Sequence, residues 1–227
     1  MSLACATCPV RDRAACAVLD DDQREELSRT GRTRRLSRGE MLFAAGEEQQ
    51  ACATLTTGVL KIATSDADGN ERILALVHPS GFVGELFGPF AQYDVVALTD
   101  CELCLFSGPA FDRALAAYPE LARALLRRTQ EDLHASRELL ALTGTAPADQ
   151  RVAGILMALA NAASDSPCHP ARRFELPLSR GELAAMLGLT IETVSRMITR
   201  FEKSGAIRRS GKRGIELLDP ARLPMRA

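Results

Sequence analysis

Apolar positions in the C-terminal third of the chain recur with the period of short helices. Ser179 and Glu182 have the spacing of a capping box at the start of one helix, in which each side chain pairs with a backbone N–H that would otherwise lack a partner. Gly188 suits the left-handed residue that ends a helix, and Thr190 suits the N-cap of the next one. The pattern predicts two short helices around a tight glycine turn, which is the geometry of a helix-turn-helix.

The second of these helices, over residues 190–203, has two distinct faces. One apolar stripe repeats at intervals of three and four residues and is expected to be buried; it consists of Ile191, Val194, Ile198 and Phe201. Glu192, Ser195 and Arg196 fall on another face, which can be turned outward. Arginine can donate two hydrogen bonds to guanine, and glutamate can accept one from cytosine. The outward face therefore has the chemistry to contact base edges in DNA.

The distribution of charge also favours contact with DNA. Residues 172–213 contain ten Lys and Arg against four Glu, a net charge of +6, whereas the whole chain carries −1. A basic region on a nearly neutral chain is typical of proteins that bind the phosphate backbone. Residues 206–217 predict a hairpin with a basic tip, where Lys212 and Arg213 would contact phosphates rather than bases.

The first half of the chain shows a strand pattern rather than a helical one. Glycines punctuate short β-prone runs over residues 36–107, which predicts a sandwich or barrel. Residues 109–143 then predict a short helix, a break before Pro119 and a long helix. The fold class is therefore α+β. The expected domains are a cysteine-rich segment at 1–19, a β domain at 20–117, a long helix at 118–144 and a winged helix-turn-helix at 145–227.

Cysteines gather at the N-terminus. Cys5, Cys8 and Cys16 lie within twelve residues, and clustered thiols of this kind indicate metal or redox chemistry. An iron–sulfur cluster takes four thiolates, so a fourth must come from elsewhere. Cys101 and Cys104 lie in one β-prone run, where residues three apart point to opposite faces, so only one is expected to face the other thiols. A structural zinc site and a thiol switch remain open.

Several motifs together resemble the CRP/FNR family of bacterial transcription regulators. The motif I-E-T-V-S-R-M-I at 191–198 is similar to the family's recognition helix, and its E-x-x-S-R spacing resembles that of the FNR branch. The N-terminal cysteine spacing is similar to the cluster-binding segment of FNR-type oxygen regulators. The segments that resemble the family's double-stranded β-roll, a jelly-roll-like domain of the cyclic-nucleotide-binding type, are R-G-E at 38–40, T-T-G-V-L-K at 56–61, D-G-N-E at 68–71 and G-F-V-G-E-L at 81–86.

This resemblance implies a DNA-binding transcription regulator rather than an enzyme. It implies an oxygen-labile [4Fe-4S] cluster, TTGAT-like half-sites and RNA polymerase as a partner. The implied cluster ligands are Cys5, Cys8, Cys16 and Cys101, with Cys104 as the alternative to Cys101. The implied DNA-contacting residues are Thr190, Glu192, Thr193, Ser195, Arg196, Arg200, Lys212 and Arg213.

The resemblance also implies that the long helix pairs with its twin in a homodimer. Its apolar seam has a period near 3.5 residues and is interrupted by Arg128 and Asp132, which would make pairing weak and conditional. The implied dimer-contacting residues are Leu121, Leu125, Asp132, Ala135, Ser136 and Leu139. The alternative is a single amphipathic helix that covers the β domain of its own chain.

Composition narrows the remaining possibilities. The phosphate of a cyclic nucleotide needs positive charge, but residues 87–97 contain no Lys or Arg and include Asp94, so cyclic AMP is not expected. The chain has no run of 18 apolar residues and no export signal, so we expect a cytoplasmic protein without a membrane span.

Nitric oxide, zinc or thiol oxidation could replace oxygen as the signal. A small-ligand regulator and an iron–sulfur electron carrier are further classes, and the second leaves residues 178–217 unexplained.

Overall fold

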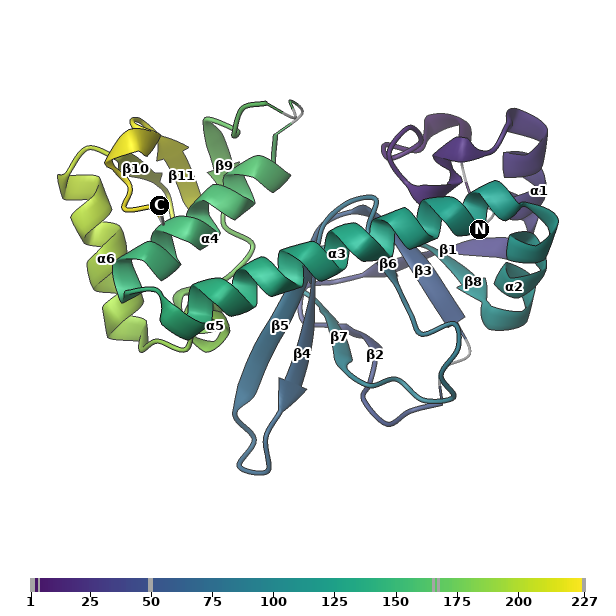
Figure 1. Ribbon diagram of the computed structural model, residues 1–227, viewed down its shortest axis with the longest axis horizontal. Helices are drawn as coiled ribbons and strands as arrows, with labels where there is room; N and C mark the ends of the chain where they lie inside the picture. Colours follow the sequence, from purple (N-terminus) through teal and green to yellow (C-terminus); the bar gives the residue numbers. More distant parts are fainter. Residues whose placement is uncertain (1–2, 4, 49–50, 165, 167, 226–227) are drawn as a thin grey trace. The chain divides into compact units, whose positions relative to one another are not determined.

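The chain has a strand-rich N-terminal part and a mainly helical C-terminal part, and the long helix α3 (Pro119–Thr145) follows the first of these along the sequence (Figure 1). The computed structural model describes residues 3, 5–48, 51–164, 166 and 168–225. It divides into two units, residues 1–136 and 137–227, and the boundary falls inside α3. Within the described residues, no helix combines the length and the apolar character needed to cross a membrane.

Two four-stranded antiparallel sheets form the β-roll of the first unit, in the orders β1-β8-β3-β6 and β2-β7-β4-β5. The strands are β1 (Gly31–Leu36), β2 (Met41–Phe43), β3 (Ala51–Thr57), β4 (Leu60–Ser65), β5 (Glu71–Val77), β6 (Phe82–Val83), β7 (Asp94–Ala97) and β8 (Cys101–Ser107). Leu55, Leu60 and Leu103 belong to one buried cluster contributed by both sheets. The α+β class and the β-roll expected from the sequence are confirmed.

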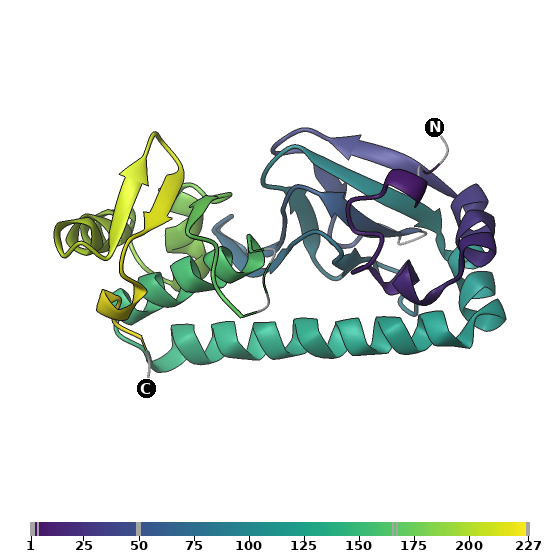
Figure 2. The same cartoon turned by 90° about the horizontal axis from the view of Figure 1, so that it is seen from above.

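A second apolar cluster covers the other face of the sheet that contains β8. It joins the strands to the helices α1 (Asp21–Thr30) and α2 (Gly108–Ala117) and to the first turns of α3. The short 3-10 turns η1 (Cys5–Thr7) and η2 (Ala15–Val18) contribute Cys5 and Cys16 to the same cluster. In Figure 2 the purple N-terminal segment lies at this end of the unit, beside the start of α3.

Two residues expected at the dimer seam lie instead inside this cluster. Leu121 and Leu125 are buried against Phe106 and Phe111 of their own chain. The first turns of α3 therefore cover the β-roll, and these two leucines cannot form an exposed seam. The sequence pattern could not separate the two faces, because both carry leucine at helical spacing.

The second unit is a winged helix-turn-helix. Its elements are α4 (Ala148–Ala162), β9 (Arg173–Glu175), α5 (Arg180–Leu187), α6 (Ile191–Lys203), β10 (Ile207–Ser210), β11 (Gly214–Leu217) and the 3-10 turn η3 (Pro220–Arg222). The three strands pair in the order β10-β11-β9. The hairpin β10-β11 was expected from the sequence, whereas the third strand, β9, was not predicted.

The turn between α5 and α6 forms as its residues predict. Ser179 and Glu182 make a reciprocal capping box, with N···O distances of 2.6 and 3.2 Å. Gly188 ends α5 with φ +62°, a conformation that costs other residues energy because of their Cβ atom. The hydroxyl of Thr190 accepts a hydrogen bond of 3.2 Å from the backbone N–H of Thr193. These local rules set the angle at which α6 leaves α5.

Candidate DNA interface and cysteine pocket

Helix α6 buries one face and exposes the other. Val194, Ile198 and Phe201 are buried, as the stripe predicts. Ile191 is 52% exposed, so its expected burial is wrong. It is the first residue of α6, and it lies near Gly181 of α5, which has no side chain to cover it. The N-terminal end of α6 therefore offers an apolar group as well as polar ones.

The polar residues expected to contact DNA gather on the open side of α6. Thr190, Glu192, Ser195 and Arg196 are exposed, and Thr193 is half-buried. Hydrogen bonds from the backbone at the start of the helix, and then from Thr190, lower the pKa of the Glu192 carboxyl. Its carboxylate is therefore kept as an acceptor, the form that can pair with the amino group of cytosine.

Two of the expected basic residues have partners within the domain. Arg200 lies 3.6 Å from the carboxylate of Asp149 in α4. The half-buried Arg213 donates a hydrogen bond of 3.0 Å to the carbonyl oxygen of Pro177, just before α5. Lys212 is exposed at the tip of the wing. The wing is thus fastened to the helix-turn-helix while its tip stays open.

A buried carboxylate that sequence reasoning missed organises the wing. Glu216 of β11 lies 3.2–3.5 Å from the guanidinium groups of three exposed arginines, Arg172, Arg173 and Arg208. The spacing of these residues in the sequence does not predict the cluster. The arginines come close to Glu216 only because β9 and β10 pair with β11 on its two sides.

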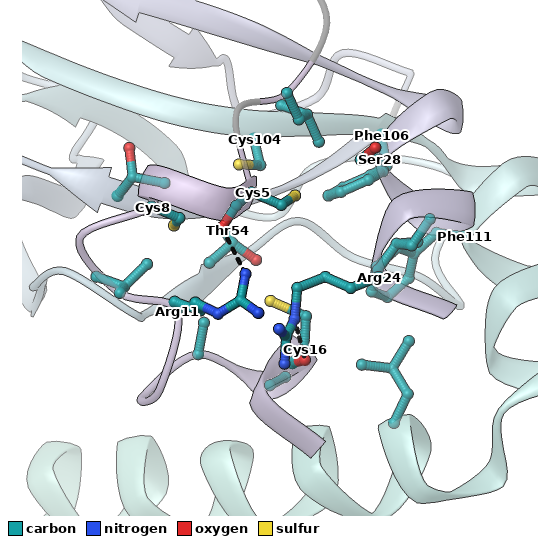
Figure 3. Close-up of a pocket in the computed structure, with 17 residues that line it drawn as sticks. Cys5, Cys8, Arg11, Cys16, Arg24, Ser28, Thr54, Cys104, Phe106 and Phe111 are labelled. Carbon is teal, nitrogen blue, oxygen red and sulfur yellow. Dashed lines mark hydrogen bonds between the residues drawn. The ribbon is translucent and has the colours of Figure 1, made fainter. Parts of the chain in front are cut away.

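Four cysteines line one cavity in the first unit. Cys5 and Cys8 come from η1 and the residue after it, Cys16 comes from η2, and Cys104 comes from β8. Figure 3 shows their sulfur atoms around the pocket, together with the guanidinium groups of Arg11 and Arg24. The fold therefore brings the three N-terminal thiols to one cysteine of the sheet.

Cys101 lies on the opposite face of β8. Its thiol is 3.2 Å from the carbonyl oxygen of Thr99 and 3.4 Å from that of Val59, and it is buried in the core between the sheets. Successive residues of a strand point to opposite faces, so Cys101 and Cys104 are separated by the sheet itself. The cavity therefore contains Cys104, the alternative to Cys101, while Cys101 lies outside it in the core between the sheets.

The four thiols influence one another. Burial, and then charge repulsion from Cys8, Cys5 and Cys16, raise the pKa of the Cys104 thiol to about 12. Burial also raises the pKa values of Cys16 and Cys5, while Arg24 acts in the opposite direction on both. Four thiolates this close would repel each other unless a positively charged centre were bound among them.

The donor set has the number and kind of ligands that an iron–sulfur cluster takes, because four thiols line the cavity. Among the residues that the structure describes, no three His, Cys, Asp or Glu side chains lie close enough together to hold one metal ion. In a [4Fe-4S] cluster each thiolate binds a separate iron, so ligands spread around a cavity suit it. The chemistry and the arrangement of the four cysteines are consistent with such a group.

Models of known protein families match both units of the chain. The model of the cyclic nucleotide-binding domain matches residues 33–118, and that of the Crp-like helix-turn-helix domain matches residues 150–225. The chain is 33% identical to the transcriptional activator protein FnrL of Cereibacter sphaeroides, over 96% of this chain and 90% of the relative. It is 31% identical to the nitrogen fixation regulation protein FixK of Bradyrhizobium diazoefficiens, over 96% and 92%. The solved structure of FixK2 from Bradyrhizobium japonicum superposes with a TM-score of 0.76 at 26% identity, covering 85% of this chain and 95% of that one.

Proposed function

Because the chain belongs to the CRP/FNR family of DNA-binding transcription regulators, we propose that it acts as a homodimer gated by an oxygen-labile [4Fe-4S] cluster. The observation that carries this proposal is the cavity lined by Cys5, Cys8, Cys16 and Cys104. FnrL, at 33% identity, is named a transcriptional activator, which supports a role in controlling transcription. RNA polymerase is the partner that such a role requires.

The four cysteines would hold the cluster, which when bound supplies a centre that reacts with oxygen. Their placement ties the N-terminal segment to β8. The same cavity is lined by Leu121 of α3 and by Phe111 of α2. Losing the common partner of the thiols would loosen the N-terminal segment and, through Leu121, the packing that supports the start of α3.

Dimerisation is proposed to use a different face of α3 from the one that the sequence indicated. Leu126, Leu133 and Leu140 recur every seven residues and are 71%, 47% and 67% exposed. Three residues after each leucine, at the alternate seam positions, lie the small polar residues Thr129, Ser136 and Thr143. A seven-residue repeat of leucine with small residues between is the pattern of a helix that pairs with a second helix. A second copy of this chain presents the same stripe and is the occupant we propose.

The other residues expected at the dimer interface fall around this stripe. Ser136 lies on it, and Asp132 lies beside it, 3.4 Å from Arg128. In a parallel pair of helices, Asp132 at one flank would face Arg137 of the second copy at the other flank. Ala135 is exposed away from the stripe, and Leu139 is half-buried. The seam therefore combines apolar contacts with a pair of opposite charges.

The proposed DNA contact places α6 in the major groove. Arg196 would donate to guanine and Glu192 would accept from cytosine within a TTGAT-like half-site. Two copies of α6 in a symmetric dimer would enter successive major grooves about 34 Å apart. Thr190, Thr193, Ser195, Arg200, Lys212 and Arg213 would contact phosphates or base edges beside them.

We propose that the β-roll does not take cyclic AMP, although its family model is named for cyclic nucleotides. The loop after Leu86, where a phosphate would need a cation, contains no Lys or Arg between residues 87 and 97. Its first residue, Phe87, is 93% exposed. A phosphate at this place would meet apolar groups and the carboxylate of Asp94.

The test is to measure iron and sulfide content together with the visible absorption spectrum, on protein purified without air and then exposed to it. We expect a brown protein with about four irons per chain, which bleaches in air while its binding to a TTGAT-containing duplex falls. Protein that stays colourless after anaerobic reconstitution would contradict the cluster and would favour zinc or thiol chemistry. Bleaching by nitric oxide but not by oxygen would change the signal and keep the centre.

A further inference from the structure

A buried arginine holds the turn that carries Cys16. Arg24 lies on α1 and is 7% exposed. Its guanidinium donates to the carbonyl oxygen of Leu19 at 2.7 Å and also faces those of Cys16 and Ala17 at 3.4 and 3.5 Å. Three main-chain oxygens from Cys16 to Leu19, in the η2 turn and the residue after it, thus converge on one side chain, which fixes the backbone at Cys16 and just after it.

A second arginine holds the turn that carries Cys5. Arg11 lies in the loop between η1 and η2, and its guanidinium donates to the carbonyl oxygen of Cys5 at 3.1 Å. Asp21, at the start of α1, joins the two arginines, because one of its carboxylate oxygens accepts from Arg11 and from Arg24, the latter at 3.0 Å. Both cysteine-bearing turns are therefore fastened to the same residue of α1.

The two guanidinium groups also line the cysteine cavity itself (Figure 3). A buried cation is costly unless it is hydrogen-bonded and charge-compensated. Asp21 compensates one positive charge, and the structure places two beside the cavity. An anionic metal–thiolate centre in the cavity would supply the remaining negative charge at short range.

We propose that Arg24, together with Arg11 and Asp21, positions the turns of Cys5 and Cys16 for an anionic iron–sulfur centre and contributes the positive charge that retains it. This inference rests on the proposed function of the cysteine cavity. Arg24 does not need to be a ligand, because arginine always carries its proton; it acts through the backbone of the residues that supply the thiols.

Structural support of α1 alone would be the simpler role for Arg24. However, α1 has its own capping box between Asp20 and Gln23, and Leu27 anchors it in the core. Arg24 does pair with Asp21 in the first turn of α1, but its three main-chain acceptors all lie in the segment before the helix. A positioning role therefore predicts a local effect on residues 5–19 when Arg24 is replaced.

The test compares Arg24→Met with Arg29→Met, which removes an exposed arginine of the same helix that lies 2.8 Å from the carboxylate of Glu25. Two quantities are measured on the full-length protein without air: the rate of iron loss to a chelator, and hydrogen–deuterium exchange of the metal-free form. Loss of a residue that orients metal ligands typically weakens metal binding about 10- to 100-fold. We expect Arg24→Met to lose iron faster by a factor in this range and to exchange faster over residues 5–19, while β3 is unchanged and Arg29→Met behaves as the wild type.

A second pair of variants keeps the test valid if Arg24→Met does not fold. Arg11→Met is expected to give the same two changes more weakly, and Arg13→Met, an exposed neighbour in the same loop, neither. Wild-type iron retention in Arg24→Met, or faster iron loss with unchanged exchange over residues 5–19, would overturn the positioning role. Wild-type protein without iron would refute the cluster instead, and the exchange measurement would still decide whether Arg24 holds the turns.

Discussion

At the scale of single residues, the side of a strand to which a side chain points decides its chemistry. Cys101 and Cys104 have similar neighbours in sequence, yet one is buried between the sheets and the other faces the N-terminal thiols. Both lie on β8, and the alternation along the strand separates them.

We therefore expect Cys104→Ala to abolish cluster uptake and Cys101→Ala to leave it unchanged. Removal of the Cys104 thiol leaves three ligands, whereas removal of the Cys101 thiol changes only the packing of the core, at a cost of about 1 kcal/mol in the free energy of unfolding. Iron content after anaerobic reconstitution distinguishes the two variants. Iron-free Cys101→Ala beside iron-loaded Cys104→Ala would reverse the assignment.

His78 gives a second prediction at this scale. Burial, and then the positive charge of Arg128, lower the pKa of His78 to about 4. Between pH 6.5 and 4, His78 is protonated in the unfolded chain but neutral in the folded chain. The free energy of unfolding therefore falls as the pH decreases through this window. The loss amounts to about 3 kcal/mol in the free energy of unfolding once complete.

The measurement is urea denaturation followed by circular dichroism at several pH values between 7.5 and 4.5. His78→Gln should flatten the dependence, because it removes the group that titrates only in the unfolded chain. His134→Gln, on the exposed part of α3, is the matched control and should keep the wild-type slope. An equal slope in His78→Gln and the wild type would show that other groups cause the loss.

At the scale of elements, α3 has two apolar faces, one buried against the β-roll and one exposed. Its first turns bury Leu121 and Leu125 against the β-roll. Leu126, Leu133 and Leu140 remain exposed on the other face. One helix thereby packs on its own domain and leaves exposed the leucine stripe that we propose pairs with a second chain.

Leu133→Glu should convert the dimer to a monomer. The substitution removes two leucines from the proposed seam and brings two carboxylates together, which costs at least about 3 kcal/mol, roughly a 100-fold change in the dimer dissociation constant. Ala135→Glu adds the same charge to the same helix but lies off the stripe, so its dimer should persist. Sedimentation equilibrium measures both, and a monomeric Ala135→Glu beside a dimeric Leu133→Glu would restore the seam first expected from the sequence.

Helix α6 carries the prediction for DNA. Arg196→Ala should reduce preference for the operator over unrelated duplex by about 1–3 kcal/mol per half-site, because a guanine loses a bidentate partner. Binding to unrelated DNA should change little. Lys203→Ala serves as the comparison, since Lys203 is an exposed cation at the other end of α6 and is not among the residues proposed to contact bases. Competition titrations at one salt concentration measure the ratio, and uniform weakening on all duplexes would make Arg196 a phosphate contact.

At the scale of the whole molecule, three separable parts would have to act together. The cysteine cavity lies in the first unit, α6 lies in the second, and α3 belongs to both. Leu121 lines the cavity and belongs to the same helix as the exposed leucine stripe. This continuity is the physical route by which loss of a cluster could weaken pairing.

Leu133→Glu is therefore expected to separate the reaction of the cluster with air from binding to the operator. We expect this variant to hold about four irons per chain and to bleach in air as the wild type does. It should nevertheless lose binding to a two-half-site operator, because only a dimer contacts both half-sites. Iron analysis and operator titration on one sample test this. Full operator occupancy by a monomeric, iron-loaded variant would show that dimerisation is not required.

Much of this protein was determined by local sequence. The capping box of Ser179 and Glu182, the left-handed Gly188 and the Thr190 cap act within a few residues, so they predict the helix-turn-helix without knowledge of the rest. The break at Pro119 and the glycine-punctuated strands are local in the same sense. The family motif on α6 adds its polar face, which depends only on helical spacing.

Tertiary structure decided what depends on distant partners. The choice of Cys104 over Cys101 follows from which face of β8 meets the N-terminal turns. The burial of Leu121 and the exposure of Leu126 follow from where α3 rests on the β-roll. Arg11 of the loop between η1 and η2 meets Arg24 of α1 at Asp21 only after the chain has turned back on itself. A periodic pattern specifies that a face exists, but which neighbour covers it is set by packing between segments far apart in the sequence.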